Sequence, residues 1–114
     1  MTKTILIVDE HWDVLETLET LLKKNGYKVL TAKNLGDCLE KIKKTKPNLL
    51  LIGYIATKGA ILDVATKING LKIAYLVTDK SEEDYLNLYA NVVGFINQTK
   101  DINEVLLKIG ELLK

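Results

Sequence analysis

The sequence contains one cysteine, one proline, one tryptophan and one histidine. A lone cysteine, Cys38, excludes an internal disulfide and is typical of a reducing compartment. The lone histidine, His11, stands beside two acids without the spacing that metal ligands need. The longest apolar run, residues 49–56, is too short to cross a bilayer, and the first residues show no secretory signal. We therefore expect a cytoplasmic protein without disulfides or a membrane partner.

The chain also lacks a large excess of either charge, because 16 basic and 15 acidic residues leave a formal net charge of +1. The lysines are mixed with glutamates, and no basic stripe of the kind that binds nucleic acid is present. No pair of a nucleophile and a base is visible in the sequence. We therefore expect neither direct nucleic-acid binding nor enzymatic activity.

What the sequence does contain is an alternation of short apolar runs and amphipathic segments over one domain, residues 1–114. Strands are predicted at residues 5–8, 27–32, 48–52, 73–77 and 92–96. Helices are predicted at residues 13–24, after Asn34, at 61–68, at 82–89 and after Asp101. Asn34 with Asp37, and Asp101 with Glu104, have the spacing of capping pairs. Cys38 lies on an apolar helical stripe, which predicts a core position.

Buried strands joined by helical crossovers predict a parallel α/β sheet with helices on both faces. The residues that we expect to be buried in the central strands are Ile7, Val8, Leu51, Ile52, Leu76 and Val77. In such sheets, ligands bind at the carboxyl ends of the strands. Asp9 and Glu10, Gly53 and Tyr54, Thr78 and Asp79, and Asn97 and Gln98 occupy those ends.

In their order and spacing, these segments resemble the receiver domain of two-component response regulators. Residues 5–10 resemble the first strand with its acidic pair, and residues 46–52 resemble the approach to the phosphoacceptor. Residues 75–78 resemble the fourth strand with its switch hydroxyl, Thr78, and residues 94–96 resemble the fifth strand with its switch aromatic, Phe95. The resemblance covers nearly the whole chain. It implies a flavodoxin-like (βα)5 doubly wound sheet in the strand order 2-1-3-4-5.

The sequence departs from that family at the phosphorylation pocket. The position of the nucleophilic aspartate falls on Gly53, which has no carboxylate to accept a phosphoryl group. The position of the family's lysine falls on Gln98, and Thr99 replaces the proline that usually follows it. A lysine buried without its anionic partners is costly, so the loss of both groups together is consistent. The resemblance and its departures predict a pseudo-receiver with a degenerate pocket formed by Asp9, Glu10, Gly53, Thr78 and Gln98.

The acidic pair, Asp9 and Glu10, marks the place where a receiver holds magnesium. With the third carboxylate missing, we interpret the pair as a remnant and expect a vacant metal site and no cofactor. Thr78 is interpreted as a cap of the following turn, and His11 as a solvated residue at the entry to the first helix. For Trp12 two interpretations stay open, namely an exposed partner anchor or a side chain folded onto the neighbouring loop.

The resemblance implies a phosphorylation-independent protein-interaction module in signal transduction or transcriptional control, with a histidine kinase or an output domain as partner classes. It also implies a homodimer or partner face made by the fourth helix, fifth strand and fifth helix, where Tyr85, Tyr89 and Val92 are the large side chains. Three alternatives remain open. The first is a small-ligand site in the space opened at Gly53, the second is an active receiver phosphorylated at Asp9 or another acid, and the third is an enzyme of unrelated chemistry.

Overall fold

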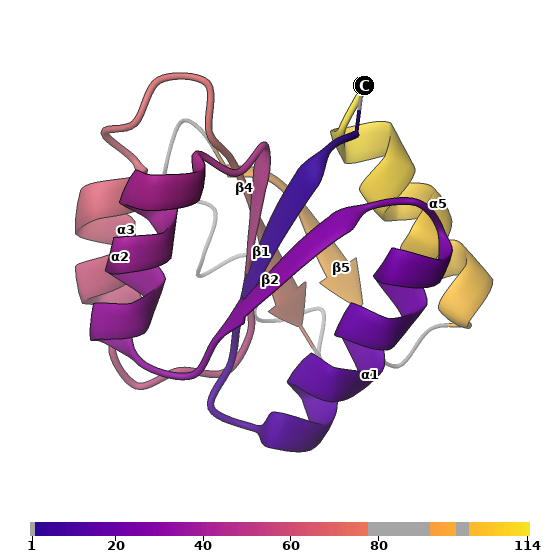
Figure 1. Ribbon diagram of the computed structural model, residues 1–114, viewed down its shortest axis with the longest axis horizontal. Helices are drawn as coiled ribbons and strands as arrows, with labels where there is room; N and C mark the ends of the chain where they lie inside the picture. Colours follow the sequence, from indigo (N-terminus) through magenta and orange to yellow (C-terminus); the bar gives the residue numbers. More distant parts are fainter. Residues whose placement is uncertain (1, 78–91, 98–100) are drawn as a thin grey trace.

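The computed structural model of the chain describes residues 2–77, 92–97 and 101–114. Within these residues, five parallel strands form one sheet in the order β2-β1-β3-β4-β5 (Figure 1). The strands are β1 (Thr4–Val8), β2 (Lys28–Ala32), β3 (Leu49–Ile52), β4 (Lys72–Val77) and β5 (Val92–Asn97). The flavodoxin-like order implied by the resemblance to receivers is therefore confirmed.

Helices cover both faces of the sheet (Figure 1). They are α1 (Trp12–Lys24), α2 (Leu35–Thr45), α3 (Lys58–Ala65) and α5 (Ile102–Leu112). One apolar cluster lies between the sheet and α2 with α3, and a second lies between the sheet and α1 with α5. Because neighbouring side chains of a strand point to opposite faces, Leu6 and Val8 enter the first cluster and Ile5 and Ile7 enter the second.

The central strands are buried on both faces, as their continuous apolar runs predict. All six residues expected to be buried are at most 4% exposed, which confirms that prediction: Ile7, Val8, Leu51, Ile52, Leu76 and Val77. Their parallel pairing brings the ends of β1 and β3 together, since Val8 pairs with Ile52. This pairing places the residues that follow the two strands side by side.

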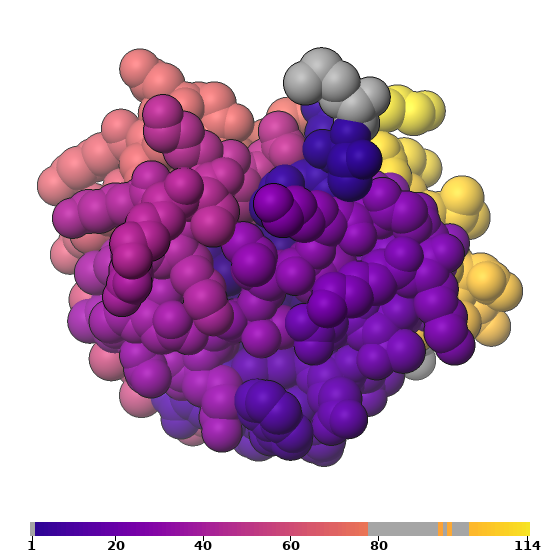
Figure 2. Space-filling model, in the orientation of Figure 1, coloured from indigo at the N-terminus to yellow at the C-terminus, as the bar shows by residue number. Residues whose placement is uncertain are grey.

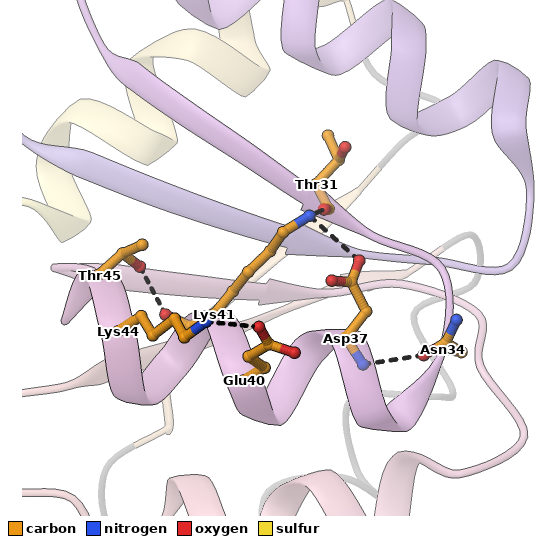
Figure 3. Close-up of polar contacts among 7 residues, drawn as sticks. All are labelled: Thr31, Asn34, Asp37, Glu40, Lys41, Lys44 and Thr45. Atoms are coloured by element: carbon orange, nitrogen blue, oxygen red, sulfur yellow. Dashed lines mark hydrogen bonds and ion pairs between the residues drawn. The ribbon is translucent and has the colours of Figure 1, made fainter.

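Helix α2 begins at the cap that its sequence predicts, and ion pairs that the structure adds lie along it (Figure 3). The side chain of Asn34 accepts a hydrogen bond from the Asp37 amide at 2.8 Å, which satisfies one of the free N–H groups of the first turn. Two lysine–carboxylate pairs four residues apart, Lys41 with Asp37 and Lys44 with Glu40, lie along the helix. Cys38 is fully buried, so its predicted core position is confirmed.

Two predicted helix details are wrong. Helix α3 begins at Lys58 rather than near Ile61, and it ends at Ala65. Ile68 misled the prediction because it packs against the core from the turn after the helix, where an apolar residue mimics a further helical turn. At α5, Asp101 caps the helix as predicted, but its side chain accepts from the amide of Asn103 rather than from that of Glu104. The helix predicted at residues 82–89 lies outside the described residues.

Candidate functional site

The predicted pocket lies at the carboxyl edge of the sheet, where β1 and β3 end next to each other. Asp9 follows β1, and its amide donates to the Ala32 carbonyl of β2 at 3.2 Å. Gly53 follows β3, and its amide donates to the Val8 carbonyl at 2.8 Å. The first bond continues the pairing of β1 with β2, and the second continues the pairing of β1 with β3, which holds Gly53 beside the end of β1. The structure thus brings together two of the residues that the sequence assigned to the pocket.

Asp9 is the buried charged residue of the described core, at 1% exposure. Its Oδ1 accepts from the His11 amide at 2.8 Å and from His11 Nδ1 at 2.8 Å. Its Oδ2 accepts from the Tyr54 amide at 3.0 Å. A buried carboxylate is tolerated only where donors replace its lost water, and three protein donors do so here.

Gly53 has the space of its side chain occupied by Asp9. An ideal Cβ on Gly53 would lie 2.0 Å from Asp9 Oδ2 and 2.9 Å from Asp9 Cγ. Gly53 is absent from the glycines with positive φ, so its backbone conformation is open to any residue. Close packing against Asp9 is therefore the reason that the position excludes a side chain. In this structure the Asp9 carboxylate fills the volume beside the end of β3.

Glu10 bonds to the loop that follows β3. Its amide donates to the Tyr54 carbonyl at 2.8 Å, and its Oε2 accepts from the Ala56 amide. Together with the bond between Asp9 and the Tyr54 amide, these contacts join the β1–α1 loop to the β3–α3 loop. Both acidic residues therefore direct their carboxylates to protein donors.

The donor set does not suit a divalent cation. Magnesium takes a near-octahedral shell of oxygen ligands, and the side chain at residue 53 that would add a third carboxylate is missing. The carboxylates of Asp9 and Glu10 are already engaged by backbone amides. Among the described residues there is no group of three or more histidine, cysteine or acidic side chains placed to hold a metal ion.

Three exposed aromatic rings, those of His11, Trp12 and Tyr54, follow the ends of β1 and β3. Tyr54 is 65% exposed, and its ring centroid lies 5.3 Å from that of His11. Trp12 is 60% exposed, and the Lys33 ammonium lies 5.0 Å from the centre of its ring. Of the two interpretations of Trp12, exposure favours the partner anchor, although the contact with Lys33 joins it to the neighbouring β2–α2 loop. His11 has an exposed ring as expected, but its bond to buried Asp9 was missed.

The remaining predicted site residues are described only in part. Thr78, Gln98, Tyr85 and Tyr89 lie outside the described residues. Phe95 and Val92 lie on β5, where their backbones pair with Tyr75 and Ile73 of β4. Tyr54 is a residue of this site that the sequence placed at a strand end without assigning it to the pocket. The signal was its place directly after Gly53, at the end of a predicted strand.

Comparison with known proteins identifies the fold family. Residues 5–109 match the response regulator receiver domain. The chain belongs to this family. A curated relative is the alkaline phosphatase synthesis transcriptional regulatory protein PhoP of Bacillus subtilis (strain 168), 29% identical over 86 residues. The match covers 73% of this chain but 36% of PhoP, so this receiver domain spans about a third of the length of that relative.

Solved structures agree with the assignment. A CheY-like receiver domain protein from Methanospirillum hungatei JF-1 is 28% identical, with a TM-score of 0.85 over 99% of this chain and 94% of that chain. A response regulator from Thermotoga maritima in complex with Mg²⁺-BeF is 22% identical, with a TM-score of 0.79 over 98% of this chain and 100% of that chain. The described part of this receiver domain has no helix long and apolar enough to span a membrane.

Proposed function

We propose that this receiver domain works without phosphorylation, as a protein-interaction module in signal transduction or transcriptional control. The observation that carries the proposal is the position of the Asp9 carboxylate in the volume that a side chain at residue 53 would need. Phosphoryl uptake by a receiver requires a carboxylate nucleophile beside a bound cation. Gly53 supplies no carboxylate, and Asp9 fills the space beside it.

The hydrogen bonds of Asp9 and Glu10 hold the loops of the pocket in one arrangement, which supports the proposal. Bonds to the amides of Tyr54 and Ala56 connect the β1–α1 loop to the β3–α3 loop, which a metal ion and a phosphoryl group connect in an active receiver. On this proposal the chain needs no ligand to order these loops. Its binding surface is then permanently formed, and regulation acts on the amount of protein or on the availability of its partner.

The alternatives receive less support from the same geometry. A small ligand bound at Gly53 would have to displace the Asp9 carboxylate and break its bond to Tyr54. Phosphorylation of Asp9 itself would require a buried carboxylate with three bonded donors to attack a phosphoryl group in line. An unrelated enzyme activity has no support beyond the Asp9–His11 pair, which here joins the start of α1 to the end of β1.

A protein partner is part of the proposal, with a histidine kinase or an output domain as the partner classes. PhoP is named as a transcriptional regulatory protein, and this chain matches about a third of it, which supports a regulatory setting. The cytoplasm is the proposed location, since a buried free thiol suits a reducing compartment. Helix α5 exposes Ile102 and Leu107, which supports the proposed dimer or partner face that includes this helix.

Titration with Mg²⁺ and beryllofluoride, a phosphoryl mimic, tests the proposal. We expect the amide NMR resonances of Asp9, Gly53 and Tyr54 to stay in place at millimolar concentrations of both reagents. A receiver that keeps its aspartate is the positive control. Saturable shifts confined to these amides would show a working phosphoryl site and overturn the proposal.

A further inference from the structure

A groove of about 440 Å³ lies between the end of α2 and the turn that connects α3 to β4. This volume is within the range of about 300–1,000 Å³ that is typical of ligand sites. The groove is at the amino end of the strands, so it is separated from Asp9 and Gly53 by the length of the sheet. Its two walls are the magenta end of α2 and the salmon α3–β4 turn, which meet at the upper left of the molecule (Figure 1, Figure 2).

The floor of this groove is apolar. Ile42, Pro47 and Leu71 line it and are buried, and Ile68 lines it and is half-buried. Exposed Asn69 and Gly70 form the wall on the side of the α3–β4 turn. An apolar floor of this kind accepts an aliphatic side chain, and the turn beside it offers polar groups.

The opposite wall carries positive charge. Lys43 and Lys46 both line the groove and are exposed, and the lining contains no acidic residue. Within the described residues, the neighbouring lysines of α2 are neutralised: Lys44 pairs with Glu40 at 2.7 Å and Lys41 with Asp37 at 3.1 Å (Figure 3). Among the same residues, Lys43 and Lys46 form no ion pair.

Local structure accounts for only one of these two cations. Lys43 stands in the last turn of α2, where a positive charge stabilises the helix dipole. Lys46 lies beyond the helix at φ 47°, in the left-handed conformation that usually favours glycine or asparagine at a helix end. The chain therefore carries a cation at a position where the backbone alone favours a residue without one.

We propose that this groove binds an acidic, partly apolar peptide segment of a partner protein. One aliphatic side chain of the segment enters the floor between Ile42 and Leu71, and flanking carboxylates lie against Lys43 and Lys46. The match of opposite charges selects this partner over a basic or neutral one. The site is separate from the degenerate pocket, so it functions whether or not the pocket takes up phosphate.

The test uses a fluorescein-labelled peptide of alternating glutamate and leucine with the intact chain at low salt. We expect saturable binding that moves the amide resonances of Asn69 and Gly70, and that weakens as salt screens the charges. Peptides with glutamine in place of glutamate, or glycine in place of leucine, test the wall and the floor separately. Both are expected to bind more weakly than the parent peptide.

The matched variants are Lys43→Gln with Lys46→Gln, and a control with Lys24→Gln and Lys108→Gln, two exposed lysines of α1 and α5, which pack on the other face of the sheet. Each pair removes the same charge. We expect the first pair to weaken binding about tenfold, since exposed ion pairs each contribute a small factor, and the control to leave it nearly unchanged. Equal affinity of both pairs, resonance shifts away from the groove, or no binding by the unaltered chain would overturn the proposal.

Discussion

The carboxylate of Asp9 lies where a side chain of residue 53 would stand, with Oδ2 only 2.0 Å from an ideal Cβ on Gly53. The absence of a side chain on Gly53 and the bonded conformation of Asp9 are therefore two aspects of one packing arrangement. Asp9 keeps its three protein donors because residue 53 is glycine. Most of the following predictions test this relationship.

Substitution Gly53→Ala should destabilise the protein by about 1–3 kcal/mol, because the new methyl group displaces Asp9 from its donors. Urea unfolding midpoints measure the change in the free energy of unfolding. The matched control is Gly59→Ala in the first turn of α3, where a Cβ meets nothing within 4 Å. Alanine is a better helix former than glycine, so this control should be neutral or stabilising. Similar midpoints for the two variants would contradict the packing argument.

A double-mutant cycle tests whether Asp9 is the group that excludes a side chain at residue 53. Asp9→Ala alone should destabilise, since it leaves the amides of His11 and Tyr54 without their acceptor. In that background Gly53→Ala should cost much less than in the original chain, with a coupling energy of about 1 kcal/mol or more. Additive costs within about 0.3 kcal/mol would show that the two positions do not compete for space.

Restoring the family's phosphorylation residues should require Asp9 to move. Gly53→Asp alone is expected to give weak labelling by acetyl phosphate and magnesium, since Asp9 fills the space and the lysine is still missing. The combination Gly53→Asp with Gln98→Lys should be labelled more strongly, because the added lysine stabilises the negative charge of the phosphoryl group from the opposite side. Intact-mass spectrometry quantifies both. Strong labelling of the single variant would show that the Asp9 side chain leaves its bonded conformation at little cost in free energy.

The Cys38 thiol offers a test of the α2 core. Burial raises the pKa of Cys38 to about 11, with a smaller contribution from the Asp37 carboxylate that outweighs the opposing Lys41 ammonium. The unfolded thiol has its ordinary pKa of 9.0, so the folded state binds the proton more tightly. The stabilisation is complete below pH 9 and is lost as pH rises from 9.0 to about 11.

Two measurements check this account of Cys38. A thiol reagent at pH 8 should react slowly with the native chain and fast in urea. The stability difference between the original chain and Cys38→Ala should shrink by up to about 2 kcal/mol across that pH window. This comparison cancels the titration of the other groups. Fast native labelling, or a difference that stays constant with pH, would contradict a buried, protonated thiol.

Much of the fold could be predicted from the sequence, because continuous apolar runs such as residues 49–52 have few alternatives to buried parallel strands. The strand order came from the resemblance to receivers rather than from the pattern itself. The end of α3 was placed too late because Ile68 continues the helical spacing beyond Ala65. Boundaries of this kind depend on where the chain must turn, which apolar spacing does not record.

The sequence could place three of the five predicted pocket residues next to one another, but it could not predict their geometry. The sequence placed Asp9, Glu10 and Gly53 at one edge of the sheet, and the structure brings them together. That Asp9 turns into the space at Gly53, and that His11 and Tyr54 hold it there, depends on side-chain rotamers and loop amides. Neither has a periodic signal in the sequence. The pseudo-receiver assignment itself stays a prediction that needs a chemical measurement.

That measurement is the intact mass of the unaltered protein after incubation with acetyl phosphate and magnesium, beside a receiver that retains its aspartate. The account predicts a mass increase of one phosphoryl group in the control and no increase in this chain, because Gly53 has no carboxylate and Asp9 is buried and fully bonded. Stoichiometric labelling of this chain that hydroxylamine removes, as it removes an acyl phosphate, would contradict the account and show an active receiver.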